Sequence, residues 1–322
     1  MTSLLQSSIP INSSTRLLDK YVLPKVALTV ITIASFIGTW LTMSTHGAGT
    51  WSQVGIRWLH LISFATLAGG FMWKGLFARP AQKVAQQPYF AQFTAASFRR
   101  FRRLTQIALP VFALTAVYDL FRFTTWGVGW VAEAEIYLLA MIVLAAGVDA
   151  YGRRPKNPFA QRNLARFILL LLMLNALVQA GFDVRLAQGG SIWPLLVRWL
   201  HLAAFGLWLG GAVWNIFITV PAARDIVSLP VVVAASQQLE RFRVAVRLIL
   251  PTLIITGFVQ AYRYVGFNLN ALTASTFGWL ILTKLLLIGV LIVVFLTCPM
   301  WRACSPISGM CKIDDLYAKE QK

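Results

Sequence analysis

The stretch RWLHLISFATLAGGFMW, residues Arg57–Trp73, decides the fold class, because after its first residue it contains no Asp, Glu, Lys or Arg. Crossing the hydrocarbon core of a bilayer takes about 20 consecutive, mainly apolar residues. The rest of the chain has the same character: of its 322 residues 58% are hydrophobic and 12% are charged, whereas soluble domains carry about 25% charged residues. The sequence therefore predicts an integral membrane protein.

The membrane-spanning segments are expected to be helices, since an open strand leaves its backbone groups unpaired in lipid. Eight apolar segments are candidates, near residues 23–45, 54–77, 104–124, 131–151, 164–184, 192–218, 245–265 and 276–298. Two basic segments, 85–103 and 226–243, are expected to form amphipathic helices against anionic headgroups. The predicted fold is all-α with eight transmembrane helices.

The basic residues predict how these helices are oriented. The net charge of +18 is concentrated in the connections 78–103, 152–166 and 219–247, whereas the connections 46–53 and 266–275 contain no Lys or Arg. Lys and Arg are enriched in cytoplasmic loops, so both termini and the three basic connections are predicted to face the cytoplasm. Basic residues distributed in this way do not indicate a nucleic-acid-binding surface.

The opening stretch occurs twice in the chain. With an offset of 141 positions it matches RWLHLAAFGLWLGGAVW, residues Arg198–Trp214, at the RWLHL pentapeptide, one Phe, the Gly-Gly pair and the final Trp. The same offset carries Thr115 onto Thr256. A match held without gaps across two spans and a connection predicts an internal repeat.

Two four-helix membrane repeats are expected, residues 1–152 and 153–298, followed by a cytoplasmic tail that contains Cys and Met, residues 299–322. Four spans in each half is an even number, so both halves enter the membrane in the same orientation, as in parallel transporter repeats. His60 and His201 are therefore predicted to lie at equal depth near the extracytoplasmic face.

The RWLHL pattern followed by Gly-Gly and an aromatic residue resembles the copper resistance protein D (CopD) family of bacterial inner-membrane proteins. The second half is the closer match, with Phe277-Gly278-Trp279 and then Lys284 in the last span, whereas Glu135 occupies the position aligned with Lys284 in the first half. The resemblance implies copper handling in the bacterial cytoplasmic membrane, with a periplasmic copper carrier as partner. A four-span unit with a membrane His is also similar to the four-helix membrane protoporphyrinogen oxidases, which implies b-type haem.

Two histidines carry the candidate chemistry, because an ionisable side chain in a span is a functional-site hypothesis by default and neutral imidazole is a common metal ligand. If His60 and His201 face each other, they could hold one haem, with Arg57 and Arg198 one turn away to bind its propionates. If each faces its own half, they form separate sites. The competing hypotheses are structural: the histidines join helices by hydrogen bonds, and the arginines reach lipid headgroups.

Further candidate copper ligands lie outside the duplicated motif. Met43 and His46, near the predicted level of His60, offer a thioether and an imidazole, a combination that suits Cu(I). The segment TCPMWRACSPISGMC offers soft sulfur ligands for Cu(I) capture in the cytoplasmic tail, namely Cys298, Cys304 and Cys311.

Several charged residues fall within the predicted spans. Asp119 can pair with Arg122 along one helix, since residues three apart are neighbours on a helix surface. Lys284 is the deepest of these charges and is expected to have an acidic partner or a polar cavity. The candidate partners are Glu133, Glu135 and Asp183.

The motifs favour a transporter or a membrane binding protein over an enzyme. The sequence contains no nucleophile–base constellation, no nucleotide-binding glycine motif and no CxxCH haem-attachment motif, and its connections are too short for a nucleotide-binding domain. The leading expectation is transport or transfer of copper ions across the membrane. The alternatives are a b-type haem subunit in electron transfer or small-molecule oxidation, and a structural subunit of a larger membrane complex.

Overall fold

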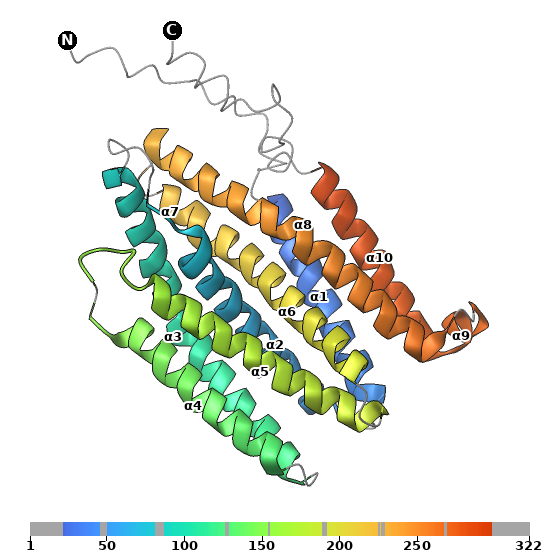
Figure 1. Ribbon diagram of the computed structural model, residues 1–322. Helices are drawn as coiled ribbons and strands as arrows, with labels where there is room; N and C mark the ends of the chain where they lie inside the picture. The colour runs from blue at the N-terminus through green and yellow to red at the C-terminus, as the bar shows by residue number, and fades with distance from the viewer. Residues whose placement is uncertain are drawn as a thin grey trace, which may run out of the picture.

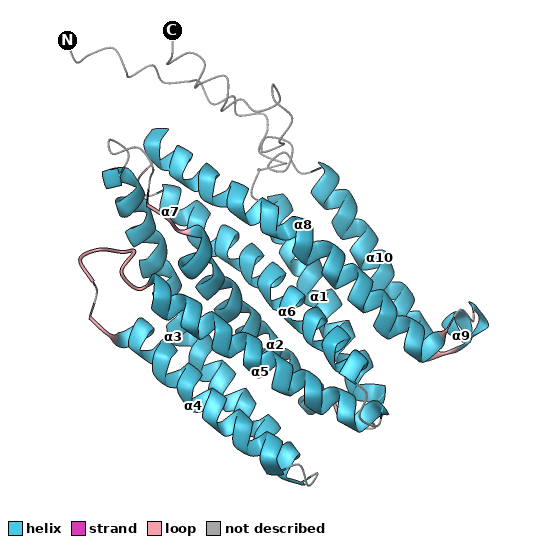
Figure 2. Cartoon of the chain, in the orientation of Figure 1, coloured by secondary structure: helices cyan, strands magenta, loops and turns pink. Residues whose placement is uncertain are grey.

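The computed structural model describes residues 22–45, 50–80, 87–125, 129–153, 155–188, 192–224, 226, 229–266 and 269–297. Within these ranges all regular structure is helical and there is no strand (Figure 2). The helices are α1 (Val22–Thr45), α2 (Trp51–Met72), α3 (Gln87–Thr125), α4 (Gly129–Tyr151), α5 (Arg162–Gln188), α6 (Ile192–Trp214), α7 (Val220–Arg224), α8 (Leu229–Val265), α9 (Leu269–Ala274) and α10 (Thr276–Thr297). Two π-helical segments, η2 (Trp73–Phe77) and η4 (Asn215–Thr219), continue α2 and α6.

Seven of the helices are long and apolar enough to cross a membrane. They lie side by side as one bundle (Figure 1). The all-helical class is therefore confirmed, and the seven helices are consistent with a multi-pass membrane protein. The eighth expected span falls on α10, where the apolar part within the described residues, Gly278–Leu291, is shorter. Eight crossings therefore stay a prediction.

The helices α3 and α8 are longer than the predicted spans. The surface helices expected at 85–103 and 226–243 are continuous with the spans that follow them, in single helices of 39 and 37 residues. Arg, Gln and Ala are good helix formers, so the polar turns that precede each apolar run are helical as well. Hydropathy locates the apolar part of such a helix but not its end.

The two helices that carry the duplicated motif, α2 and α6, form the centre of the bundle (Figure 1). Their backbones meet at the Gly-Gly pairs: a Cβ added to Gly69 would overlap the backbone of Gly210, and one added to Gly210 would overlap the carbonyl oxygen of Ala65. The second glycine of each pair faces a ring, Gly70 that of Phe101 and Gly211 that of Phe242. Small residues allow membrane helices to approach closely, so the Gly-Gly pairs hold the central helices together.

We expect Gly210→Ala to destabilise the bundle by about 1–3 kcal/mol, the usual cost of overpacking, because its methyl group has no room against α2. The matched control is Gly147→Ala in α4, where an added Cβ meets nothing within 4 Å. There the gain in helix propensity of up to about 1 kcal/mol should leave stability unchanged or raised. Denaturation by SDS in mixed micelles would measure the stability of both variants. Equal effects of the two substitutions would contradict the close approach of α2 and α6 at the Gly-Gly pairs.

An aromatic cluster covers the crossing of α2 and α6. Trp73 and Trp214, the last residues of the duplicated stretch, stack with ring centroids 5.6 Å apart and planes inclined by 6°. Phe101 lies 5.3 Å from Trp214, and Phe242 lies 5.2 Å from Trp73, both between ring centroids. Each Trp therefore packs on a Phe from the other half of the sequence.

The outer helices interlock the two halves of the chain. The first helix, α1, packs along the last one, α10, while α5, which begins the second half, packs along α4, which ends the first (Figure 1). Both α1 and α5 also contact the central pair α2 and α6. The two sequence halves are thus not separate four-helix units in space, because each gives its first helix to the other.

Candidate functional site

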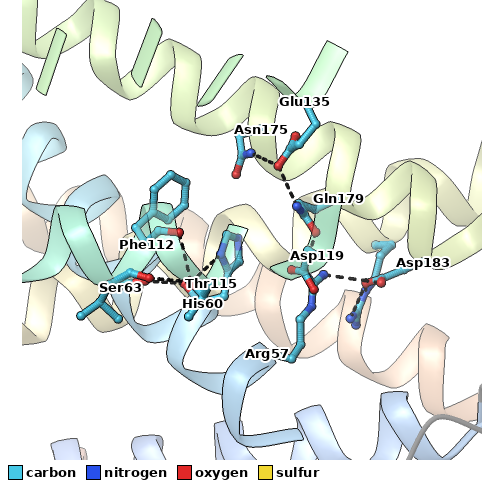
Figure 3. Close-up of polar contacts among 12 residues, drawn as sticks. Arg57, His60, Ser63, Phe112, Thr115, Asp119, Glu135, Asn175, Gln179 and Asp183 are labelled. Atoms are coloured by element: carbon cyan, nitrogen blue, oxygen red, sulfur yellow. Dashed lines mark hydrogen bonds and ion pairs between the residues drawn. The ribbon is translucent and has the colours of Figure 1, made fainter. Parts of the chain in front are cut away.

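His60 is enclosed near the middle of α2 and is held by α3. Its residue is 2% exposed, and its ring stacks on Phe112 with centroids 4.9 Å apart. Its Nδ1 lies 3.1 Å from Oγ1 of Thr115, also on α3 (Figure 3). The ring therefore has one defined orientation, set by a neighbouring helix.

The hydroxyl group of Thr115 determines which nitrogen of His60 carries the proton. That hydroxyl lies 2.7 Å from the carbonyl oxygen of Val111 and 3.0 Å from that of Phe112, and a carbonyl can only accept a hydrogen bond. With its proton directed to the backbone, Thr115 Oγ1 accepts from Nδ1–H of the imidazole. The neutral tautomer then has its lone pair on Nε2, the form in which His binds metals.

His201 repeats this arrangement in the second half. Its Nδ1 lies 3.0 Å from Oγ1 of Thr256 on α8, and Thr256 donates to the carbonyl oxygen of Thr252 at 2.5 Å. Its ring also covers Gly257, where an added Cβ would lie 3.2 Å from Cε1 of the imidazole. Both histidines therefore donate Nδ1–H to a threonine of the same sequence half.

Each histidine is held through Nδ1 by its own half of the chain, His60 by α3 and His201 by α8. This arrangement favours the separate one of the two geometries considered for the histidines. Arg57 and Arg198, expected to bind haem propionates in the shared geometry, bind protein side chains in the structure.

Arg57 is at the centre of a buried polar network. Its Nη1 donates to Oδ2 of Asp119 at 2.7 Å and also to Oε1 of Gln179. Its Nη2 lies 3.5 Å from Oδ1 of Asp183 (Figure 3). The side chains of Arg57 and Asp119 are only 8% and 4% exposed, so this pair lies inside the bundle and Arg57 does not extend to lipid headgroups.

Asp183 connects the two copies of the motif. Its Oδ2 accepts from Nε of Arg198 at 2.9 Å and from Nη2 at 2.8 Å, while its Oδ1 faces Arg57. Arg198 also donates through Nη1 to Oε1 of Gln260 on α8, at 3.1 Å. One carboxylate on α5 thus links the arginines of α2 and α6, one helical turn from the two histidines.

Glu135 extends the network to α4. Its Oε1 accepts from Nδ2 of Asn175 at 2.6 Å and from Nε2 of Gln179 at 2.8 Å (Figure 3). Gln179 therefore donates to Glu135 and accepts from Arg57. Glu135 is fully buried, and its other oxygen, Oε2, has no hydrogen-bond partner among the described residues.

Two expected pairings of charged residues differ in the structure. Asp119, expected to pair with Arg122 along its own helix, pairs across helices with Arg57. The Nζ atom of Lys284 lies beside Gly38 of α1, 2.9 Å from where a Cβ would stand. Among the described residues the acids proposed for Lys284 are engaged elsewhere or, like Glu133, exposed. Sequence spacing along one helix cannot report contacts between helices.

The Trp residues of the motif fasten the neighbouring helices. Nε1 of Trp58 donates to Oγ of Ser35 on α1 at 3.0 Å, and Nε1 of Trp199 donates to the carbonyl oxygen of Met173 on α5 at 3.0 Å. Within RWLHL, therefore, the Arg enters the ion network, the Trp holds the preceding helix, and the His contacts the following one.

The remaining candidate copper ligands are placed only in part. Met43 is buried on α1, whereas His46, Cys298, Cys304 and Cys311 lie outside the described residues. Within the described part of the chain no group of three or more His, Cys, Asp or Glu residues is close enough to hold a metal ion together.

Four polar residues of this site were not identified from the sequence. Asn175, Gln179 and Gln260 carry no charge and belong to no motif, and a fifth residue, Thr115, shares the position of Thr256, because the two threonines were noted only as a match to each other. The usable signal was the offset itself, since Thr115 and Thr256 lie at the same distance from the two histidines. An amide side chain in an otherwise apolar helix is a second signal of a polar contact inside the bundle, because buried polar groups are normally hydrogen-bonded.

Comparison with known proteins adds no relative: no protein-family model, curated protein or solved structure matches the chain significantly.

Proposed function

We propose that the protein transports copper across the bacterial cytoplasmic membrane, with His60 and His201 as two separate binding positions. In this proposal the chain crosses the membrane eight times, α10 being the last crossing, and 1–152 and 153–298 are tandem repeats. Both termini face the cytoplasm, as the basic connections favour, and the histidines lie near the extracytoplasmic face.

The observation that carries the proposal is the threonine that orients each histidine. Metal-binding histidines usually donate their second N–H to a neighbouring acceptor, which fixes the tautomer and the ring orientation. Here Thr115 and Thr256 supply that acceptor at 3.1 Å and 3.0 Å. Imidazole nitrogen is a suitable ligand for copper in both oxidation states. His60 and His201 therefore each offer one Nε2 atom as a copper ligand.

The separate placement of the two histidines favours a cargo over a resident metal ion. Conduction requires sites that bind strongly enough for an ion to enter and weakly enough for it to leave. His60 and His201 lie on different helices and are bonded to different partners. An ion held by one imidazole and transient ligands can move on, whereas a full set of protein ligands would retain it.

The test is Cu(I) uptake into proteoliposomes that contain a copper-sensitive dye, with a reductant present. The double variant His60→Ala, His201→Ala should lose uptake. A matched control is Leu59→Ala with Leu200→Ala, which changes the exposed residue beside each histidine and should leave uptake unchanged.

The absorption spectrum of the purified protein separates the alternatives. A Soret band that the double His variant lacks would support the b-type haem subunit and overturn the copper proposal. Uptake that persists in the double variant, without a chromophore, would leave the histidines with a structural role.

A further inference from the structure

We infer that Glu135 is a proton-binding site and that it exchanges its proton for the transported cation. The site is Glu135 on α4, held by Asn175 and Gln179 on α5. Proton binding follows from the local geometry alone, whereas the exchange rests on the function proposed above. Glu135 is not one of the proposed copper ligands and contacts neither histidine.

The first argument is the unequal state of the two carboxyl oxygens of Glu135. Oε1 accepts two N–H groups, at 2.6 Å from Asn175 and 2.8 Å from Gln179. Oε2 is buried and has no donor among the described residues. A buried carboxylate needs its charge paired and its oxygens bonded, so the species that the Glu135 carboxyl group lacks is a proton.

An acceptor for a proton on Oε1 of Glu135 is present on the same clamp. Oδ1 of Asn175 is also buried without a hydrogen-bond partner among the described residues. A half-turn of the Asn175 amide would exchange Oδ1 with Nδ2, which is 2.6 Å from the Glu135 carboxyl. That separation suits an O–H···O hydrogen bond, so the clamp can hold the neutral acid as well as the anion.

The second argument is the charge balance of the network. Among its described side chains, Arg57 and Arg198 carry two positive charges, and Asp119 and Asp183 carry two negative charges. These four neutralise each other, and the further cation Lys284, which interacts electrostatically with Arg198, belongs to none of these ion pairs. An ionised Glu135 would add a fully buried negative charge to which no cation is bonded among the described residues, and such a charge is strongly unfavourable. The bonded network is neutral when Glu135 holds a proton.

The same balance gives the proton a role in transport. When one Cu(I) ion enters beside the network, it adds one positive charge, and loss of the Glu135 proton to solvent removes one. The total charge then stays constant, and no electron is transferred. Gln179 connects the two events, because it donates to Glu135 and accepts from Arg57, one turn from His60. Binding of Cu(I) to Nε2 of a neutral imidazole releases no proton from the ring.

Infrared spectroscopy of the reconstituted full-length protein tests proton binding without copper. Wild type should show the carbonyl band of a protonated carboxylic acid, shifted in D2O, and Glu135→Gln should lose it. Glu133→Gln is the matched control, because Glu133 lies on the same helix but is exposed, and it should keep the band. A band that persists in Glu135→Gln, or is absent from wild type, would overturn the inference.

A pH-sensitive dye and a copper-sensitive dye, in parallel vesicle samples, test the exchange. Wild type and Glu133→Gln should release a proton as Cu(I) enters, and Glu135→Gln should lose this release. Proton release that is unchanged in Glu135→Gln would overturn the exchange. If wild type takes up no copper but shows the infrared band, the transport proposal fails and the proton site stands. If wild type takes up copper but shows no infrared band of a protonated carboxylic acid, the transport proposal stands and the proton site fails.

Discussion

Replacing Arg57 by methionine should lower the free energy of unfolding by about 3–5 kcal/mol, the usual cost of removing one partner from a buried ion pair. Asp119 would lose its 2.7 Å partner, and Asp183 would lose its contact with Arg57 and keep its ion pair with Arg198. The network would then carry one uncompensated negative charge, while methionine keeps most of the apolar volume of the arginine stem. SDS denaturation in mixed micelles would measure the loss.

The double variant Arg57→Met, Asp119→Leu should recover most of that stability. Replacing both members of a buried pair by apolar residues is often neutral, and the remaining pair of Arg198 and Asp183 is balanced. Arg103→Met, at an exposed position, is the control and should stay within about 0.5 kcal/mol of wild type. If Arg57→Met behaved like Arg103→Met, the network would have no role in stability.

Replacing both threonines by valine should weaken Cu(I) binding by about 10–100-fold, the effect typical of losing the group that orients a metal-binding histidine. Valine has the shape of threonine but offers no acceptor to Nδ1–H of His60 or His201. Each imidazole would then lose its fixed tautomer and orientation. Competition against a chromophoric Cu(I) chelator, with the purified variants, would measure the affinity.

The conservative variants Thr115→Ser and Thr256→Ser provide the control for this prediction. Serine keeps the hydroxyl oxygen that lies about 3 Å from each Nδ1 and can donate its proton to the same backbone carbonyls. The serine variants should therefore bind Cu(I) almost as tightly as wild type. Equal losses for serine and valine would indicate a packing effect of the methyl group.

The features predicted correctly from the sequence are those carried by local patterns. The apolar runs located the long helices, because hydropathy over about 20 residues reports membrane insertion directly. The 141-residue offset paired His60 with His201 and Thr115 with Thr256, and the structure has equivalent contacts in the two pairs. An offset finds equivalent positions without any knowledge of how the helices pack.

The features that were missed depend on which helix faces which. Asp119 pairs with Arg57, 62 positions away, and Arg57 reaches Gln179, 122 positions away. Neither sequence separation corresponds to a helical or strand period, and an uncharged amide such as Gln179 does not appear in a charge pattern. The exchange of α1 and α5 between the halves was missed for the same reason, since an internal repeat is compatible with both separate and interlocked units.

The pairing of the first helix with the last has a consequence for biosynthesis. Thr45, at the end of α1, and Thr276, at the start of α10, are 231 positions apart. At about 5–20 residues per second, the ribosome needs roughly 10–50 s to cover that distance. Until then the surface of α1 that will pack on α10 contacts lipid, while α2 to α5 already have partners among the helices made before them. Although α1 is made before the other described helices, it is therefore among the last of them to reach its final neighbours.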